Sequence, residues 1–505
     1  MGQNDTEPGV ILGKDSETGA EITLTQEARR LGVYVMGTTG TGKTTLLKRI
    51  AVQDMEAGAG LCVLDPHGDL TDELLALVPK WREPEVILFA PGDKKHQYEY
   101  PLGLNIFACD RSDPQQRDLV ASTVISTLKK LFSYSWGPRM EDLLRSGILT
   151  LMDWEDSTFL DLWLLLALPD YRVYYTQTGK VTSSYLRKFW QVFSQYSPHD
   201  RAEIVGSSLN KIGRFLSNPV VRNIVSQPES AFDMREIMDT GKILFCNLAK
   251  GDLGEDNSSL FGAVLVNLIL IAALQRRDVP PRERKLFHLI VDEYQSFATE
   301  SFPTLQSEAR KYAIDVIVAH QYRDQLDELN KGSTLNVANL LVLRVSGKDS
   351  FELASQFDNT PPEPEVKMEP VYRQVTAIDG KPIFVERKDP PTKTKQFHEV
   401  EQPQRLYSDV AAERANQLSL LPGLVALCRL LEEDKQHKKK RLVLVEHEIE
   451  IEPIEWEREP DFDQAERIRE QSRARGRPRA EIEAMVDAKT ERTLIFDEAL
   501  PPARA

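Results

Sequence analysis

The stretch from Gly37 to Thr45 constrains the fold of this chain more than any other, because it matches the phosphate-binding pattern G-x-x-x-x-G-K-[ST]. The apolar run Val33–Met36 before it predicts a strand, and the apolar residues of Thr45–Val52 recur at helical spacing. A strand, a glycine-rich loop and a helix in this order direct backbone N–H groups and the positive end of the helix dipole at an anion. We therefore predict that a nucleoside triphosphate binds to Gly37, Thr38, Thr39, Gly40, Thr41, Gly42, Lys43, Thr44 and Thr45.

Two motifs together predict the cofactors. In the loop, Lys43 is expected to meet the β- and γ-phosphates, and the Thr44 hydroxyl to ligate Mg²⁺. Downstream, Leu286–Val291 predicts a buried strand that delivers Asp292 and Glu293 at its carboxyl end. In this arrangement one carboxylate holds Mg²⁺ while its neighbour polarises the attacking water. We therefore predict ATP and Mg²⁺ as cofactors, Thr44 and Asp292 as metal ligands, and Glu293 as the catalytic base.

Further polar side chains suit phosphoryl transfer. The run Asp315–Gln321 predicts another strand, and Gln321 at its end is the kind of amide that senses a γ-phosphate or orients water. Arg310 lies between the two strands, and Arg344 follows them. A phosphoryl transition state gains from an added guanidinium, often donated by a neighbouring subunit, which either arginine could supply. A surface ion pair is the alternative for each.

Strands alternate with helices around these motifs, which predicts an α/β fold with a parallel sheet. Gly60–Asp65, Val86–Phe89 and Lys242–Leu248 are the other candidate strands. Ligands bind at the carboxyl ends of such strands, where the phosphate loop and the segment Asp65–Asp69 both fall, so the two could share one site. His67 in that segment is more often a turn residue than a ligand.

The chain changes character between residues 106 and 238, where helical periodicity replaces strand-like runs, as in Leu119–Leu128. This predicts an all-alpha insertion domain that divides the sheet domain into residues 1–105 and 239–358. Basic and aromatic residues interleave in the insertion, for example around Lys211. They could meet a nucleic-acid backbone, with the solvated rim of a helical core as the alternative.

Residues 359–505 are predicted to be a linker and a C-terminal extension, since prolines cluster near residues 360–364 and 389–392. Within it, Glu413–Glu433 has helical spacing and Arg441–Val445 predicts a strand. Lys438–Arg441 and Arg473–Arg479 are basic clusters. The second contains a Gly-Arg-Pro core like that of minor-groove hooks, but Pro478 also suits an ordinary helix start.

Taken together, these motifs resemble those of the TraG/TraD-like conjugative coupling ATPases, which carry the type IV secretion DNA-binding domain and belong to the HerA/FtsK group of RecA-like motors. The resemblance covers about residues 10–358. It implies a RecA-like P-loop NTPase fold with a central, mostly parallel sheet, an all-alpha insertion domain and an irregular C-terminal extension. It also implies that Arg310 is the arginine finger acting in trans and that Gln321 is the γ-phosphate sensor. The motifs that carry it are Gly37–Thr45, Leu64–Asp69, Ile290–Thr299, Ser307–Tyr312 and Ala319–Gln321.

The function expected from this resemblance is an ATP-hydrolysing DNA translocase, assembled as a hexameric ring, in DNA transfer or mobile-element DNA processing. Two alternatives stay open: a nucleotide-dependent recruiter of DNA or protein that does not translocate, and a HerA-like motor with a separate nuclease. Glu293 counts against the recruiter, because a switch needs no base. The expected partners are single- or double-stranded DNA, further copies of the chain, and a relaxosome, secretion-channel or nuclease protein.

The composition and the apolar runs limit where in the cell the protein can work and how it can bind DNA. A net charge of −15 argues against a protein that coats nucleic acid, although a motor can confine its basic residues to a channel. The four cysteines form no C-x-x-C pair, which favours a reducing cytoplasm. The longest apolar run, Leu260–Leu274, predicts a buried helix, so no integral membrane segment is expected. Coupling proteins of the secretion type usually begin with transmembrane helices, and this departure puts docking to a membrane channel in question.

Overall fold

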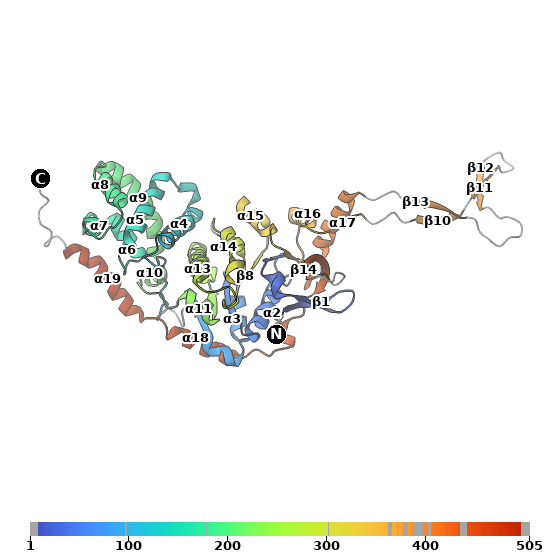
Figure 1. Ribbon diagram of the computed structural model, residues 1–505, viewed down its shortest axis with the longest axis horizontal. Helices are drawn as coiled ribbons and strands as arrows, with labels where there is room; N and C mark the ends of the chain where they lie inside the picture. The colour runs from blue at the N-terminus through green and yellow to red at the C-terminus, as the bar shows by residue number, and fades with distance from the viewer. Residues whose placement is uncertain are drawn as a thin grey trace. The chain divides into compact units, whose positions relative to one another are not determined.

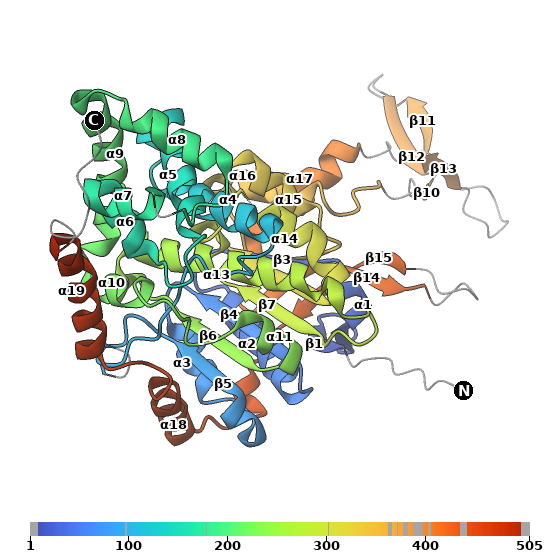
Figure 2. The same ribbon diagram turned by 60° about the vertical axis from the view of Figure 1, so that its left-hand side comes forward.

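The computed structural model describes residues 9–95, 98–177, 179–300, 302–361, 366–370, 372–376, 382–386, 397–401, 406–434 and 442–495. The chain divides into two units. The first comprises residues 1–343 and 422–505, and the second comprises residues 344–421. All the predicted site residues from Gly37 to Gln321 belong to the first unit, shown in Figures 1 and 2.

The first unit is built on an eleven-stranded sheet with the order β2-β1-β15-β14-β9-β3-β8-β7-β4-β6-β5. From β9 to β5 every neighbouring pair is parallel, so the carboxyl ends of these strands meet at one edge. The strand before the phosphate loop, β3, is separated from β7, which precedes Asp292, only by β8. The parallel strands are β3 (Val33–Met36), β4 (Gly60–Asp65), β5 (Val86–Phe89), β6 (Ile243–Asn247), β7 (Phe287–Val291), β8 (Ile314–His320) and β9 (Asn339–Val342).

The remaining strands extend the sheet in antiparallel fashion. Near the start of the chain, β1 (Val10–Asp15) and β2 (Glu21–Leu24) form an antiparallel hairpin. Two strands of the C-terminal region, β14 (Val425–Glu433) and β15 (Leu442–Glu450), pair with each other and join β9 to β1. The strand predicted around residues 441–445 is therefore confirmed from Leu442 onward, whereas the basic cluster at 438–441 lies outside the described residues.

The helical interpretation of the whole stretch from Glu413 to Glu433 is wrong. A helix, α17 (Tyr407–Leu420), ends before Pro422, and the residues from Val425 onward form β14. Most apolar residues of β14 are buried, and β9 and β15 pair with it on both sides. Continuous burial of this kind gives a short apolar run whose spacing does not distinguish a helix from a strand.

Helices cover both faces of the parallel sheet (Figure 2). On one face, α2 (Lys43–Glu56), α3 (Asp69–Leu75) and α18 (Phe462–Arg473) share a core with alternate strand residues such as Leu61 and Val63. On the other lies α13 (Glu255–Gln275), the one helix among the described residues long and apolar enough to cross a membrane. Most of α13 is buried inside the protein, which confirms the buried helix predicted for Leu260–Leu274.

The described residues between 106 and 238 form helices joined by loops and contain no strand. Most of these helices gather on one side of the sheet (Figure 1). The first of them packs against α13, and the last packs against α13 and β4. They are α4 (Pro114–Leu131), α5 (Pro138–Leu151), α6 (Phe159–Ala167), α7 (Pro169–Gln177), α8 (Ser184–Ser194), α9 (Pro198–Leu216), α10 (Pro219–Val225) and α11 (Met234–Thr240).

The stretch that resembles a minor-groove hook is bound to its own protein. A helix, α19 (Arg479–Ile495), begins directly after Pro478, which confirms the helix-start interpretation. The Arg473 and Arg479 guanidinium groups lie over the rings of Tyr100 and Tyr98, at 4.3 and 4.6 Å from the ring centroids. These arginines therefore fasten the C-terminal helices to the sheet domain.

The second unit, taken by itself, packs α16 (Lys348–Ala354) against α17. It also contains two antiparallel strand pairs. The second proline cluster, at residues 389–392, and Pro362–Pro364 of the first lie outside the described residues. The paired strands are β10 (Val366–Pro370) with β13 (Phe397–Glu401), and β11 (Tyr372–Thr376) with β12 (Pro382–Glu386).

Gly262 of α13 allows close packing next to the predicted site, and its replacement tests this packing. A Cβ atom at Gly262 would lie 2.0 Å from Cδ1 of the buried Phe297 ring. Gly262→Ala should therefore lower the free energy of unfolding by about 1–3 kcal/mol, because the ring has to move. Thermal unfolding of the purified variant measures the loss.

Gly206→Ala in α9 is the matched control, since nothing lies within 4 Å of the added methyl group. This second variant should be neutral, or more stable by up to about 1 kcal/mol, because alanine favours a helix. Equal destabilisation by both changes would contradict the packing argument.

Candidate active site

The predicted phosphate loop joins β3 to α2 in the conformation that anion binding requires. Gly40 and Gly42 have φ values of 76° and 109°, which only glycine adopts easily. Since α2 begins at Lys43 with a glycine before it, the first N–H groups of this helix point at the loop and are available to phosphate oxygens. The Lys43 amine donates to the Gly37 carbonyl at 2.8 Å, and burial lowers its pKa.

Two adjacent carboxylates face this loop from the end of β7. Asp292 and Glu293 are 5% and 4% exposed, and Glu293 Oε1 lies 4.0 Å from the Lys43 amine. Burial raises the pKa of Asp292 to about 7, with further contributions from the negative charges of Glu293 and Asp65. The site therefore holds more buried negative charge than Lys43 alone neutralises.

The carboxylates at the end of β7 suit a magnesium ion that also binds phosphate. No group of three or more His, Cys, Asp or Glu side chains that could hold a metal occurs in the part of the chain that the structure describes. Mg²⁺ commonly takes one or two protein oxygens and completes its shell with phosphate oxygens and water. Asp292 and Thr44, which follows Lys43 in the first turn of α2, are residues of this kind.

The segment from Asp65 to Asp69 borders the same site, as the sequence predicted. Asp65 ends β4 beside β7, and its carboxylate accepts the backbone N–H groups of His67 and Thr71 at 2.9 and 3.0 Å. Asp65 thus orders the turn into α3 while its charge acts on Asp292. His67 is exposed and joins this turn through its backbone, in keeping with the turn interpretation.

Glu293 is held by two side-chain amides. Gln321 Nε2 donates to Glu293 Oε1 at 2.5 Å, and Gln295 Nε2 donates to Oε2 at 2.6 Å. Gln321 also accepts a hydrogen bond from the Thr39 hydroxyl at 2.8 Å, so it joins the phosphate loop to the end of β7. Glu293 itself has a φ of 44°, a left-handed conformation that costs a residue other than glycine about 1–3 kcal/mol.

Sequence reasoning missed two residues of this arrangement. Gln295 comes two residues after Glu293 and lies within the motif Ile290–Thr299, but the sequence analysis assigned it no role. His320, beside Gln321, is buried, and its ring meets the Tyr34 hydroxyl at 2.7 Å. Burial lowers the pKa of His320 to about 3, so the ring is neutral and fixes the end of β8 to β3.

The two candidate arginines belong to different units of the chain. Arg310 is exposed in a short 3-10 helix, Ala309–Tyr312, and its guanidinium makes no hydrogen bond or ion pair with the residues the structure describes. An exposed, unpaired guanidinium is free to reach another molecule. Arg344 is the first residue of the second unit.

The basic and aromatic residues of the insertion mostly serve its own packing. The Lys211 amine lies 5.8 Å from the centroid of the Phe132 ring and donates to Ser207 Oγ at 3.0 Å. The Arg214 guanidinium lies 6.0 Å from the centroid of the same Phe132 ring and forms an ion pair with Asp256 of α13. These contacts favour the helical-core interpretation.

Comparisons with known proteins agree with this geometry. A family model described as "Type IV secretion-system coupling protein DNA-binding domain" matches residues 17–357. The chain is 22% identical over 380 residues to the type 4 coupling protein DotL of Legionella pneumophila (strain Philadelphia 1). This match covers 63% of the chain and 48% of DotL, so the chain spans about half the length of this relative.

Solved structures show the same fold at low identity. The plasmid coupling protein TrwB in complex with ADP and Mg²⁺ has a TM-score of 0.54 and 16% identity, covering 87% of this chain and 89% of that one. TrwB with a non-hydrolysable GTP analogue has a TM-score of 0.56 and 16% identity, covering 88% of this chain and 89% of that one. VirB4 of Thermoanaerobacter pseudethanolicus has a TM-score of 0.50 and 13% identity, covering 90% of this chain and 98% of that one. The expected RecA-type NTPase fold with a large, mostly parallel sheet is confirmed.

The raised pKa of Asp292 predicts how stability depends on pH. The folded protein holds this proton more tightly than the unfolded chain, so the cost of the buried charge is absent at low pH and grows as pH rises to about 7. Asp292→Asn should therefore stabilise the nucleotide-free protein by about 1–3 kcal/mol at about pH 8, and by less at about pH 5. Thermal unfolding at both pH values measures this.

Asp252→Asn, which removes an exposed carboxylate, serves as the control and should change stability little at either pH. If Asp292→Asn increases the stability equally at both pH values, burial of the Asp292 charge is not the cause of the increase.

Proposed function

The chain belongs to the family defined by the type IV secretion-system coupling protein DNA-binding domain, and we propose that it is an ATP-hydrolysing motor that moves DNA in conjugative transfer or mobile-element processing. The observation that carries this proposal is the position of Glu293. Its carboxylate lies 4.0 Å from the phosphate-loop lysine and is held by an amide that also contacts the loop. A carboxylate placed in this way suits activation of water beside a γ-phosphate.

Each residue of the site has a part in this proposed reaction. Lys43 binds the β- and γ-phosphates, the backbone of the loop wraps them, and Glu293 takes a proton from the attacking water. Thr44 and Asp292 would hold Mg²⁺, and the bound ion would neutralise phosphate charge. Gln321 acts as the γ-phosphate sensor in this proposal, which its hydrogen bonds to Thr39 of the phosphate loop and to Glu293 support. The TrwB structure with ADP and Mg²⁺ supports the choice of cofactors.

Hydrolysis, rather than nucleotide-dependent recruitment alone, is favoured by the strain at Glu293. The left-handed backbone of this residue is kept against a cost of about 1–3 kcal/mol. A switch that only changes shape with nucleotide has no need of a strained, buried carboxylate that two amides orient. Residues in such conformations are commonly retained where a side chain has to be aimed at a reaction.

The remaining parts of the proposal follow from the family and from Arg310. The family description names DNA as the ligand, and whether it is single- or double-stranded is for experiment. We place the protein in the cytoplasm as a ring of identical subunits. In such a ring the exposed Arg310 guanidinium of one subunit completes the site of the next and stabilises the charge of the transition state.

Steady-state ATP turnover tests the motor directly. Purified protein should hydrolyse ATP, and one form of DNA, single- or double-stranded, should stimulate the rate. Glu293→Gln should lower kcat by at least about 10²-fold while nucleotide still binds, because the base is lost and the phosphate loop is intact. Fluorescent-nucleotide binding checks the second part.

Glu283→Gln is the matched control, because Glu283 is exposed and lies outside the site. Its turnover should equal that of the wild type. Turnover that neither DNA form changes would exclude the translocase and favour a recruiter. DNA-stimulated turnover that requires an added nuclease partner would favour the HerA-like alternative.

Mixing two inactive variants tests the trans role of Arg310. Arg310→Ala and Glu293→Gln should each abolish most turnover alone. In a mixed ring, an Arg310→Ala subunit keeps its own Glu293 and receives Arg310 from a Glu293→Gln neighbour, so part of the activity should return. The readout is ATP turnover against mixing ratio.

Arg282→Ala, which removes another exposed arginine, is the control and should keep full activity alone. No recovery at any ratio, although the subunits mix, would mean that Arg310 does not act between subunits.

A further inference from the structure

The short turn that follows Glu293 is held from three sides. It is a 3-10 turn, Tyr294–Ser296. The buried Tyr294 hydroxyl donates to Asn330 Oδ1 at 2.5 Å, and the Gln295 amide donates to Glu293. The third contact comes from the helical insertion, where the Lys130 amine donates to the carbonyls of Gln295 and Ser296 at 3.0 and 3.2 Å.

Lys130 differs from its neighbour Lys129 in its surroundings. Both lie in the last turn of α4, but Lys129 reaches the exposed Glu300 carboxylate at 3.1 Å. Lys130 instead points into the protein, and burial lowers its pKa to about 8 in spite of attraction from Asp327. Removing an amine from water is unfavourable unless hydrogen bonds replace the lost hydration, and here two backbone carbonyls of one turn do so.

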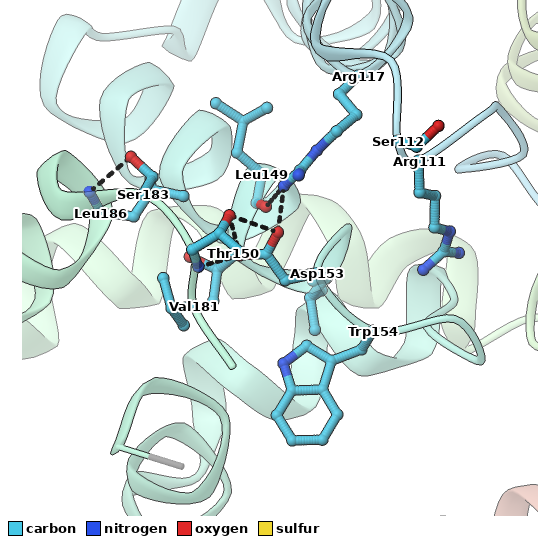
Figure 3. Close-up of polar contacts among 12 residues, drawn as sticks. Arg111, Ser112, Arg117, Leu149, Thr150, Asp153, Trp154, Val181, Ser183 and Leu186 are labelled. Carbon is cyan, nitrogen blue, oxygen red and sulfur yellow. Dashed lines mark hydrogen bonds and ion pairs between the residues drawn. The ribbon is translucent and has the colours of Figure 1, made fainter. Parts of the chain in front are cut away.

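The other end of α4 is fastened to the rest of the insertion. Figure 3 shows Arg117, near the start of this helix, between Asp153 and the Leu149 carbonyl. The ion pair with Asp153 measures 2.7 Å and the hydrogen bond to Leu149 2.9 Å. Because Asp153 also accepts the Thr182 N–H at 2.9 Å, α4 is joined to both α5 and the segment before α8. The first turn of α4 is therefore fixed to the rest of the insertion, and its last turn to the segment after Glu293.

We propose that Lys130 is a positioning residue for Glu293, through which the helical insertion sets the rate of ATP hydrolysis. Lys130 fixes the carbonyls of the turn, the turn fixes Gln295, and the Gln295 amide orients the carboxylate of Glu293. A nucleic-acid strand or protein that displaces the insertion thereby changes the alignment of the base. This inference rests on the hydrolytic function proposed above.

The bonding pattern separates this role from nucleotide binding. The hydrogen-bond partners of Lys130 among the described residues are carbonyls of the turn, whereas Lys43 and the loop from Gly37 to Thr45 bind the phosphates. Loss of Lys130 should therefore misalign the base and leave the affinity for nucleotide unchanged. Misplacement of a reacting group by less than 1 Å is enough to slow a reaction about tenfold.

The first experiment compares Lys130→Met, Lys130→Arg and Lys129→Met with the wild type. Methionine keeps the length of the side chain but removes the donor, so kcat should fall about tenfold with the KM for ATP within about twofold. Lys130→Arg retains donors and should recover most of the rate. Lys129→Met, the control, should match the wild type. Thermal unfolding and fluorescent-nucleotide binding verify that each variant is folded, and Lys130→Gln replaces Lys130→Met if the latter does not fold.

A double-mutant cycle tests whether Lys130 acts through Gln295. Gln295→Ala alone should lower kcat, and adding Lys130→Met to it should cause little further loss, because the link is already broken. A role of Lys130 in general stability would instead give independent, multiplicative effects and would overturn the proposal. Unchanged kcat in Lys130→Met would also overturn it, while leaving the hydrolytic function intact. Absence of turnover in the wild type would overturn both.

Discussion

Buried negative charge at the carboxyl edge of the sheet is the constraint on which the rest of the site depends. Asp65, Asp292 and Glu293 end neighbouring strands in a space from which water is largely excluded, with the Lys43 amine as the nearby cation. Repulsion in such a place is unfavourable in the nucleotide-free protein. Such a site favours binding of a cation that is itself bound to an anion, and a magnesium–nucleotide complex is a ligand of this kind.

The way in which Glu293 is held suits a base. Gln321 and Gln295 orient both of its oxygens with neutral amides. An ion pair with arginine would orient the carboxylate as well but would favour its charged form more strongly and weaken it as a proton acceptor. Because Gln321 also contacts Thr39, the orientation of the Glu293 carboxylate is linked to the phosphate loop. Because the turn that carries Gln295 is bound to Lys130, it is linked to the insertion too.

The phosphate loop is supported by residues far away in the sequence. The backbone N–H of Leu424 donates to the Thr41 carbonyl at 2.9 Å, and its side chain lies against Gly42. Leu343 packs against Gly37 from the end of β9. In the sequence, the second unit, residues 344–421, lies between Leu343 and the segment that contains Leu424. Since β14 and β15 extend the sheet beside β9, residues after 421 are part of the sheet domain itself.

The local pattern of the sequence by itself determined the strand, loop and helix around Lys43, the carboxylates after β7, Gln321 after β8 and the helical character of the insertion. The family resemblance drawn from these motifs is confirmed by the family match over residues 17–357. Lys43, Asp292, Glu293 and Gln321 were predictable as neighbours, because parallel strands bring their carboxyl ends to one edge.

Only the tertiary structure decided which distant groups support these residues. The hydrogen bond between Lys130 and Gln295 joins residues 165 positions apart in the sequence. The hydrogen bond between Leu424 and Thr41 joins two segments separated by most of the chain. The same holds for β14, whose apolar run is compatible with a helix until β9 and β15 pair with it. Periodicity records which face of an element is buried, but the partner that buries it is set by the path of the chain.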